Sequence, residues 1–252
     1  MMGSLPTHSK PSKLISMRKL TATLCLTLAV LLGSVGLSWS ADFQKGLTAA
    51  QSGDFATALR EWAPLAEQGR ASAQFNLGQL YRGGQGVPKD YKTAVKWYTL
   101  AAEQGHAKAQ YSLGLRYWRG EGAPQDYKAA VKWFTLAAKQ GEARAQYNLG
   151  VTYEKGNGVP RNYKTAVKWY RLAAEQGYAD AQYNLGLMYG YGEGVTLDFA
   201  YAYMWWDIAA SSGKHKKASK NREIAAKKMS PSQIKKAQGL VRDCIRKKYK
   251  GC

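Results

Sequence analysis

Few residues in this 252-residue chain could do covalent chemistry. Ser211 and Lys214 have the S-x-x-K spacing in which penicillin-binding enzymes place a nucleophilic serine and a lysine, and Ser16 and Lys19 repeat it near the N-terminus. The K-T-G and S-D-N partners of that chemistry follow neither pair. Because so short a pattern arises by chance, we expect neither serine to be a nucleophile.

The histidines and glycines that could bind a metal ion or a phosphate also lack the spacing that such sites require. No two of the histidines, His8, His106 and His215, stand at the i, i+4 spacing of a helical metal site. The segment 190–194, Gly-Tyr-Gly-Glu-Gly, superficially resembles a phosphate loop, but no strand precedes it and residues 156–158 repeat its Gly-x-Gly pattern. We therefore expect solvated histidines, no metal, no cofactor, no catalytic residue and no enzymatic activity.

The first 40 residues have the features of an export signal. Residues 17–19, Met-Arg-Lys, form a short basic segment, and residues 20–37 are apolar or small and carry no charge. Residues 38–40, Ser-Trp-Ser, place small side chains where a signal peptidase would cut before Ala41. We expect cleavage and a periplasmic or secreted protein, with translation starting at Met17 as an alternative start. An uncleaved membrane anchor is the alternative to cleavage.

Two of the three cysteines would remain after cleavage, because Cys25 lies in the apolar run. Cys244 and Cys252 are an even pair in an exported chain, which is compatible with a disulfide closing a small C-terminal loop. Two free thiols are the alternative.

A fixed period organises the centre of the chain. A block that reads A-Q-[FY]-[NS]-L-G begins at residues 73, 109, 145 and 181, always 36 residues apart. A period in this range indicates stacked supersecondary units. We count five units over about residues 42–213, of which the first lacks the long Gly-Pro linker.

Each unit is predicted to hold two helices. In the first complete unit, helix A spans about residues 73–81 and helix B about residues 91–104, and the Gly-Pro linker between them cannot be helical. Asp90 fits the N-cap of helix B. Gly78 recurs inside every later helix A, although glycine there costs about 1 kcal/mol, so a helix is predicted to pack where a Cβ would clash. Trp97 recurs every 36 residues and is predicted to pack between units.

The C-terminal residues form a basic tail. Residues 214–252 contain 14 basic and two acidic residues, so they carry +12 of the net charge of +20. Residues 230–233, Ser-Pro-Ser-Gln, form a capping box. One face of the helix that follows is predicted to cover the last hydrophobic face of the array, and it holds Ile234, Ala237, Val241, Cys244 and Ile245. The predicted parts are therefore a signal peptide (1–40), a repeat array (41–213) and a basic helical cap (214–252).

The repeat resembles the Sel-one-like family, a variant of the tetratricopeptide repeat. The resemblance rests on A-Q-[FY]-N-L-G-x-x-Y, then G-x-G-[VA]-P-x-[DN]-Y-x-x-A-V-K-W, then L-A-A-x-Q-G, and covers about 170 residues. It implies an all-α protein, a right-handed α/α superhelix, that acts as an adaptor between proteins, often in bacterial envelopes. One branch of the family is cysteine-rich and binds or hydrolyses β-lactams. The units of this chain contain no cysteine, which argues against that activity. A hydrolase or binder of β-lactam or peptidoglycan-type ligands is therefore kept only as the alternative function.

The candidate partner site is the surface of helix A, which lines the concave side of such arrays. A row beside the constant leucines could hold peptide backbone, and it consists of Asn76, Ser112, Asn148 and Asn184. Positions one to two turns later differ between units and could set specificity; they include Arg82, Trp118, Arg119, Glu154, Lys155 and Tyr191. Ordinary solvated surface is the alternative.

These features predict a non-catalytic scaffold exported to the cell envelope. It would bind a protein or peptide partner and regulate or assemble envelope enzymes. The basic tail could contact an anionic envelope surface or a glycan. Export argues against nucleic acid, which would lie in another compartment, and we expect a monomer. Solvated charge without a partner is the alternative for the tail.

Overall fold

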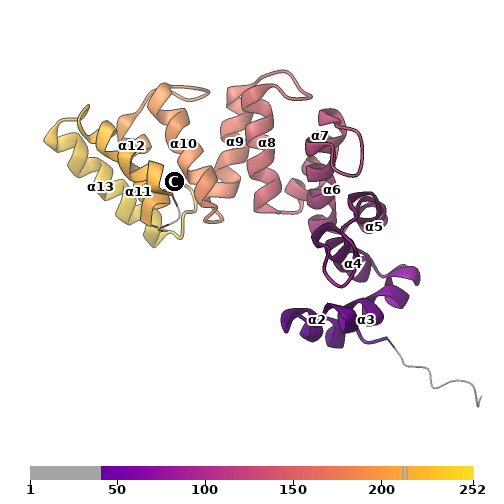
Figure 1. Cartoon of the computed structure of the whole chain (residues 1–252). Helices are drawn as coiled ribbons and strands as arrows, with labels where there is room; N and C mark the ends of the chain where they lie inside the picture. The colour runs from indigo at the N-terminus through magenta and orange to yellow at the C-terminus, as the bar shows by residue number, and fades with distance from the viewer. Residues whose placement is uncertain (1–40, 212, 214) are drawn as a thin grey trace, which may run out of the picture. The chain divides into compact units, whose positions relative to one another are not determined.

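The computed structural model describes residues 41–252 except 212 and 214. The predicted signal peptide therefore lies outside the described residues. From Asp42 onward the chain forms one compact unit. All regular elements of this part are α-helices, and five consecutive helix pairs precede two C-terminal helices (Figure 1). The prediction of an all-α repeat array is confirmed.

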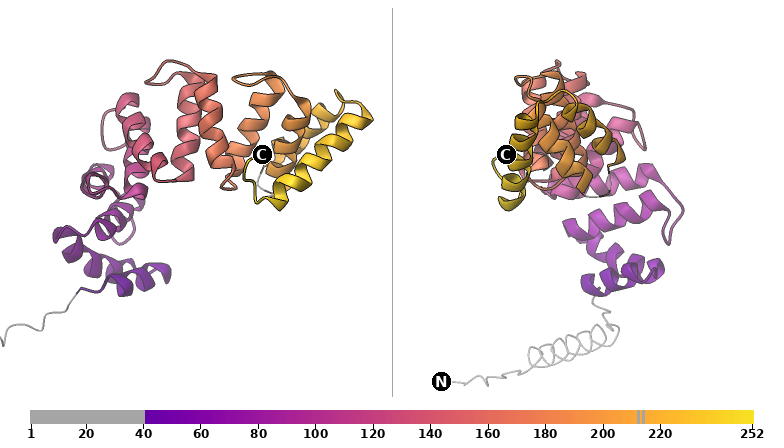
Figure 2. Two further views of the ribbon diagram at one scale, coloured as in Figure 1. Left: turned by 180° about the vertical axis from the view of Figure 1, so that it is seen from behind. Right: turned by 90° about the vertical axis from the view of Figure 1, so that its left-hand side faces the viewer.

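The five pairs alternate A and B helices along the chain. The A helices are α2 (Phe43–Gln51), α4 (Ala71–Gly83), α6 (Ala107–Arg119), α8 (Ala143–Lys155) and α10 (Ala179–Tyr191). The B helices are α3 (Phe55–Glu67), α5 (Tyr91–Glu103), α7 (Tyr127–Lys139), α9 (Tyr163–Ala174) and α11 (Phe199–Ser211). Each A helix packs on the B helix of its own unit, and each B helix packs on the A helix of the next (Figures 1 and 2).

The predicted helix starts are confirmed for the B helices. The Asp90 carboxylate accepts hydrogen bonds from the backbone amides of Lys92 and Thr93 at 2.9 and 3.3 Å, which satisfies two of the orphan amides of the first turn. The equivalent caps of α7, α9 and α11 are Asp126, Asn162 and Asp198. Helix A begins two residues before the predicted start, because Gly69 reverses the chain at φ 91° and the helix follows after one extended residue, Arg70.

The glycine inside helix A allows an aromatic ring of helix B to approach. A Cβ on Gly114 would lie 2.7 Å from two ring carbons of Phe134, which is fully buried. Gly78 faces Tyr98 and Gly186 faces Trp206 in the same way. The predicted clash is confirmed, and it explains why every unit keeps a residue that weakens the helix.

The tryptophan series packs between units, as predicted. Trp97, Trp133 and Trp169 are partly buried, and each packs against the hydrophobic cluster of the preceding unit. Trp205, in the last unit, is fully buried. No ligand is needed to explain the series.

A row of buried glutamines joins the units and was not predicted. Gln74 donates to the Ala66 carbonyl at 3.0 Å across the turn between two units, and Gln104 donates to Gln74 at 2.7 Å. Gln110 and Gln146 repeat both contacts, so the linkage recurs from unit to unit. A buried amide with its hydrogen bonds made fixes the register of neighbouring units.

The basic tail forms α12 (Lys216–Ala226) and α13 (Pro231–Arg246), and the predicted capping box at Ser230 and Gln233 is present. Both helices pack on α11. Ala237, Val241 and Cys244 are buried as predicted, but the placement of Ile245 on the covered face was wrong because its side chain is 48% exposed.

A disulfide joins Cys244 to Cys252, with their Cα atoms 5.5 Å apart. It closes the turn that follows α13. Glu175 at the end of α9 accepts a hydrogen bond from the Gly251 amide at 3.2 Å, so this C-terminal turn is also attached to the array. In the part of the chain that is described, no helix combines the length and apolarity that a bilayer crossing requires.

Candidate partner-binding surface

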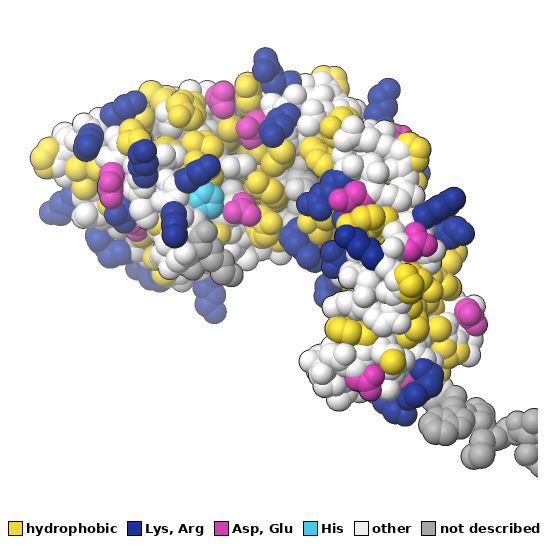
Figure 3. All heavy atoms as spheres, in the orientation of Figure 1, with side chains coloured by type: hydrophobic (Ala, Val, Ile, Leu, Met, Phe, Trp, Pro, Cys, Tyr) yellow, Lys and Arg dark blue, Asp and Glu magenta, His cyan; other side chains and the backbone are white. Residues whose placement is uncertain are grey.

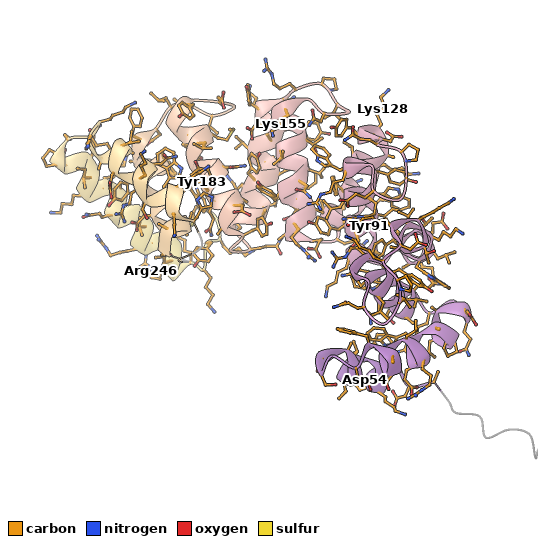
Figure 4. The ribbon with its side chains drawn as sticks, in the orientation of Figure 1. Asp54, Tyr91, Lys128, Lys155, Tyr183 and Arg246 are labelled. Atoms are coloured by element: carbon orange, nitrogen blue, oxygen red, sulfur yellow. A yellow bond between two sulfur atoms is a disulfide. The ribbon has the colours of Figure 1, made fainter. Side chains whose placement is uncertain are left out.

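The C-terminal ends of the A helices present a row of exposed and varied side chains. Arg119 and Lys155 are exposed at the ends of α6 and α8 (Lys155 is labelled in Figure 4), and the equivalent last residue of α4 is Gly83. Tyr191 ends α10 and is 71% exposed, which is far more than any other large apolar side chain identified as exposed. We call Arg119, Lys155 and Tyr191, which stand 36 residues apart, the A-end row. Cations there also interact favourably with the helix dipole, so their charge by itself does not require a partner.

The predicted asparagine row is partly engaged within the array. Asn76, Ser112, Asn148 and Asn184 are all half-buried. Burial raises the pKa of Tyr111, and a hydrogen bond with Asn148 partly opposes that rise. Burial likewise raises the pKa of Tyr147, which hydrogen bonds with Asn184. These amides therefore connect neighbouring A helices, a role that the sequence analysis did not assign to them.

Other predicted specificity residues pack against the buried aromatic of helix B in their own unit. The Trp118 ring lies 6.2 Å from the Phe134 ring, between centroids. Where helix B carries Tyr170, the residue at the Trp118 position is Glu154, and it accepts a hydrogen bond from the tyrosine hydroxyl. Burial, followed by the Glu154 charge, raises the pKa of Tyr170.

The last unit completes this series. It carries Trp206 on helix B and Gly190 at the equivalent position of helix A, where a Cβ would lie 2.8 Å from the indole. A large ring on helix B thus coincides with the smallest residue on helix A. Variation at Trp118, Glu154 and Gly190 therefore follows the size and polarity of a core residue, and internal packing accounts for it. Arg82 occupies the same position in the first complete unit and donates to Gln79, which also accepts from the helix B aromatic Tyr98, so it too is engaged within its unit.

A buried ion pair that sequence reasoning missed holds one linker. Arg116 is only 4% exposed and pairs with Glu121, and its guanidinium lies 5.2 Å from the centre of the Tyr91 ring. The equivalent residues Leu80, Thr152 and Met188 are uncharged. The sequence feature that could have indicated this ion pair is a single arginine at a repeat position that is uncharged in the other units.

The expectation of solvated histidines was wrong for both histidines that are described. The His106 ring stacks on Phe75 at 4.9 Å between centroids, and its Nδ1 accepts the Ala109 amide at the start of α6. Burial, followed by the positive charge of Lys108, lowers its pKa. His215 stacks on Tyr183 at 4.0 Å. The chain places both rings over an aromatic of helix A, which spacing alone did not reveal.

The described residues hold no metal-binding cluster, and Ser211 is engaged at the end of its helix. The Ser211 hydroxyl donates to the Ile208 carbonyl at 2.7 Å, as a helix-end residue does, and Lys214, Ser16, Lys19 and His8 lie outside the described part. No group of three or more His, Cys, Asp or Glu side chains able to hold a metal ion was found there. Gly192 and Gly194 belong to the repeat linker, with φ of 71° at both.

The tail carries its charge on the surface. In Figure 3, Lys and Arg side chains gather over the part of the surface formed by α12 and α13. One of its arginines is engaged internally, since Arg222 donates to Asp207 of α11 at 2.7 Å. The lysines of α12 and α13 are exposed.

Fold and surface together define a helical-repeat protein built from paired helices. The Sel1 repeat matches residues 71–106, 107–142, 143–178 and 179–214, and the chain belongs to the Sel1 repeat family. The first helix pair lies outside the match, in agreement with its missing linker. Proteins of this family are generally non-catalytic scaffolds for protein interactions.

Solved structures agree with this assignment. The chain is similar to a protective antigen present in uropathogenic Escherichia coli strains that displays an SLR fold, with 37% identity and a TM-score of 0.76 over 82% of this chain. The alignment covers only 46% of the antigen, so this chain spans about half of its length. It is also similar to a Sel1 repeat protein from Oxalobacter formigenes, with 31% identity and a TM-score of 0.67, over 79% of this chain and 88% of that chain. Among curated proteins, no match was found.

Proposed function

We propose that this protein is a non-catalytic scaffold, exported to the bacterial cell envelope, that binds a protein or peptide partner on its A helices. The A-end row carries the proposal, because its exposed side chains differ between units while the backbone beneath them repeats. Arg and Tyr are among the side chains that most often dominate the energy of an interface. Packing explains neither the 71% exposure of Tyr191 nor its difference from Lys155 and Arg119.

The row also indicates the chemistry of the partner. Arg119 and Lys155 are cations, and Tyr191 offers a flat apolar ring with a polar tip. An extended segment with carboxylates and one apolar anchor would complement these three residues. Because Asn148 and Asn184 already hydrogen bond within the array, we place recognition on the A-end row and leave the asparagines a supporting role.

Photocrosslinking from the row tests this binding face. A photoreactive amino acid at position 191 in the full chain should give a discrete protein adduct in cells, identified by mass spectrometry. The matched control is position 108, because Lys108 is exposed at the opposite end of an A helix, α6. If both positions gave equal adducts, or position 191 gave none, the A-end row would not be the binding site.

Export is tested separately. The signal features predict a mature chain that begins at Ala41, and periplasmic extraction followed by mass spectrometry of the intact protein would show it. A chain that keeps its first 40 residues and sediments with membranes would favour the anchor. Regulation or assembly of envelope enzymes follows only if the crosslinked partner is such an enzyme, and the basic tail would add attraction to an anionic envelope surface.

A further inference from the structure

The outward face of the B helices repeats two lysines and a leucine. Lys164, Lys168 and Leu172 stand four residues apart and so share one face of α9. The positions 36 and 72 residues earlier carry the same residue types in α7 and α5, and all six lysines are exposed. The three leucines, Leu100, Leu136 and Leu172, are 44, 38 and 37% exposed. We call these nine residues the Lys-Leu surface; Lys128, labelled in Figure 4, lies in the first turn of α7.

The stability of the helices does not explain these lysines. The first lysine is the second residue of its helix in α5, α7 and α9, where the helix dipole disfavours a cation, and no acidic residue stands in the first turn of these helices. The second lysine follows four residues later, so the two charges repel. Among the described residues, no ion pair includes any of the six. The N-cap carboxylates Asp90 and Asp126 offset part of the repulsion in α5 and α7, and the Lys132 amine lies 5.5 Å from the centre of the Trp133 ring. An anionic partner would relieve both unfavourable interactions.

The chain itself shows that this face can accept a helix. Ile208 and Met204 of α11 lie 36 residues after Leu172 and Lys168, and they are only 2 and 1% exposed. They share one buried cluster with Val241 and Cys244 of α13. In the last unit, therefore, an amphipathic helix covers the face that remains open in α5, α7 and α9.

The exposed lysines give the sign of the charge that would complement the open face. In the covered unit the positions of Lys164 and Lys168 are held by Ala200 and Met204, which carry no charge and are 8 and 1% exposed. The complement of the open face is therefore a set of carboxylates. The ion pair of Asp207 with Arg222 has no counterpart there, because the equivalent residue of α9 is Arg171, which donates to the Tyr189 hydroxyl at 2.7 Å, and those of α7 and α5 are threonines.

A concave site on α9 offers room for an apolar anchor. Its volume is about 340 Å³, within the range of ligand-binding pockets. Three apolar side chains line it, and three cations and one carboxylate surround them; these residues are Val167, Leu172 and Val195, with Lys164, Lys168, Arg171 and Glu175. The Glu175 carboxylate already accepts the Gly251 amide, so the lining keeps an excess of positive charge. A single Leu, Met or aromatic side chain flanked by carboxylates would match this lining.

The geometry assigns to the Lys-Leu surface an acidic amphipathic helix of a partner protein. The helix lies on the outer face of α9, and on α7 and α5 if it is long enough, as α13 lies on α11. Its apolar side chains contact the leucines, one of them enters the site on α9, and its carboxylates pair with the lysines. This surface is separate from the A-end row, so each assignment stands or falls alone.

A designed peptide tests the assignment on the full mature chain. The probe is a fluorescein-labelled 21-residue peptide with leucine at i, i+4 and i+7 spacing, glutamate beside the leucines and alanine at the remaining positions, so that it can form a helix. Its binding is followed by fluorescence anisotropy at 50 and 300 mM NaCl. We expect K164E/K168E to weaken binding at least tenfold and Leu172→Ser to weaken it several-fold at both salt concentrations. The matched control K235E/K236E makes the same charge change on exposed lysines of α13 and should alter binding less than twofold.

Three results would overturn the assignment. Equal loss from the two double variants would mean general attraction to a basic protein. Unchanged binding after Leu172→Ser would mean that the leucines are not contacts. Binding to phosphatidylglycerol vesicles that shows the same dependence on Lys164 and Lys168, with no binding of the peptide, would mean a lipid surface instead. Circular dichroism of every variant confirms that these exposed substitutions leave the fold intact.

Discussion

Replacing Gly114 by alanine should destabilise the protein, although alanine is the better helix former. The intrinsic preference favours alanine by about 1 kcal/mol. The new methyl group, however, would lie 2.7 Å from two carbons of the Phe134 ring and 3.3 Å from the Ala130 carbonyl oxygen. Phe134 is fully buried and cannot swing into solvent, and overpacking of this kind costs about 1–3 kcal/mol. Because the carbonyl also resists movement, we expect the upper part of that range and a net loss of about 1–2 kcal/mol.

Gly239→Ala is the matched control, since this glycine is also helical but its Cβ would meet only an Arg242 nitrogen at 3.9 Å. It should gain about 0.4–1 kcal/mol. Urea unfolding followed by circular dichroism measures both variants, and an unchanged slope against urea checks that the comparison is valid. Loss of cooperativity between units would change that slope. If Gly114→Ala stabilised the protein as Gly239→Ala does, the close-approach explanation of the repeated glycine would be refuted.

Three further outcomes are expected. Reducing the C-terminal disulfide, which spans eight residues, should cost about 2–3 kcal/mol by loop entropy, and thermal unfolding with and without dithiothreitol measures it; Cys252→Ser should make the reductant irrelevant. Burial raises the pKa of Tyr98 from 10.0 to about 12, so the folded state holds this proton more tightly, and stability present below pH 10 should be lost as the pH rises towards 12. Tyr98→Phe should remove that part of the alkaline loss in a pH series of urea midpoints. Glu154→Ala should cost about 1–3 kcal/mol by removing the carboxylate that accepts from the Tyr170 hydroxyl and leaving this hydroxyl only its contact with Asn184. Adding Tyr170→Phe should recover part of the loss in a double-mutant cycle.

Most of the fold could be predicted from the 36-residue repeat period. Helix pairs, caps and the glycine contact could be predicted because each is local, or because it recurs at a fixed distance. The placement of Ile245 failed for a different reason: helical periodicity puts it beside Cys244, but it cannot say where the covering surface of α11 ends. The start of helix A was also missed by two residues, since the turn at Gly69 and not the apolar pattern determines it.

The candidate site was harder to predict, because exposure and internal contact look alike in a sequence. Glu154 and Trp118 vary between units as a specificity row should, yet each contacts the helix B aromatic 16 residues later. A comparison of those two positions in every unit would have found the pairing. Stacking of His106 on Phe75 had no comparable signal, since the stacking residue changes type from unit to unit.

Variation between units therefore cannot by itself identify a binding surface in this array, and neither can constancy. Leu113 and Leu149 are constant because they are buried, and Glu154 varies because its core neighbour varies. Two sets of residues are not explained by internal packing. One is the exposed A-end row, which differs between α6, α8 and α10, and the other is the exposed lysines of α5, α7 and α9, which are the same in these three helices. A row that varies suits one ligand that touches several units in different ways. A row that is constant and electrostatically unfavourable suits a ligand that meets each unit in the same way, so the two surfaces should differ in how binding depends on the number of intact units.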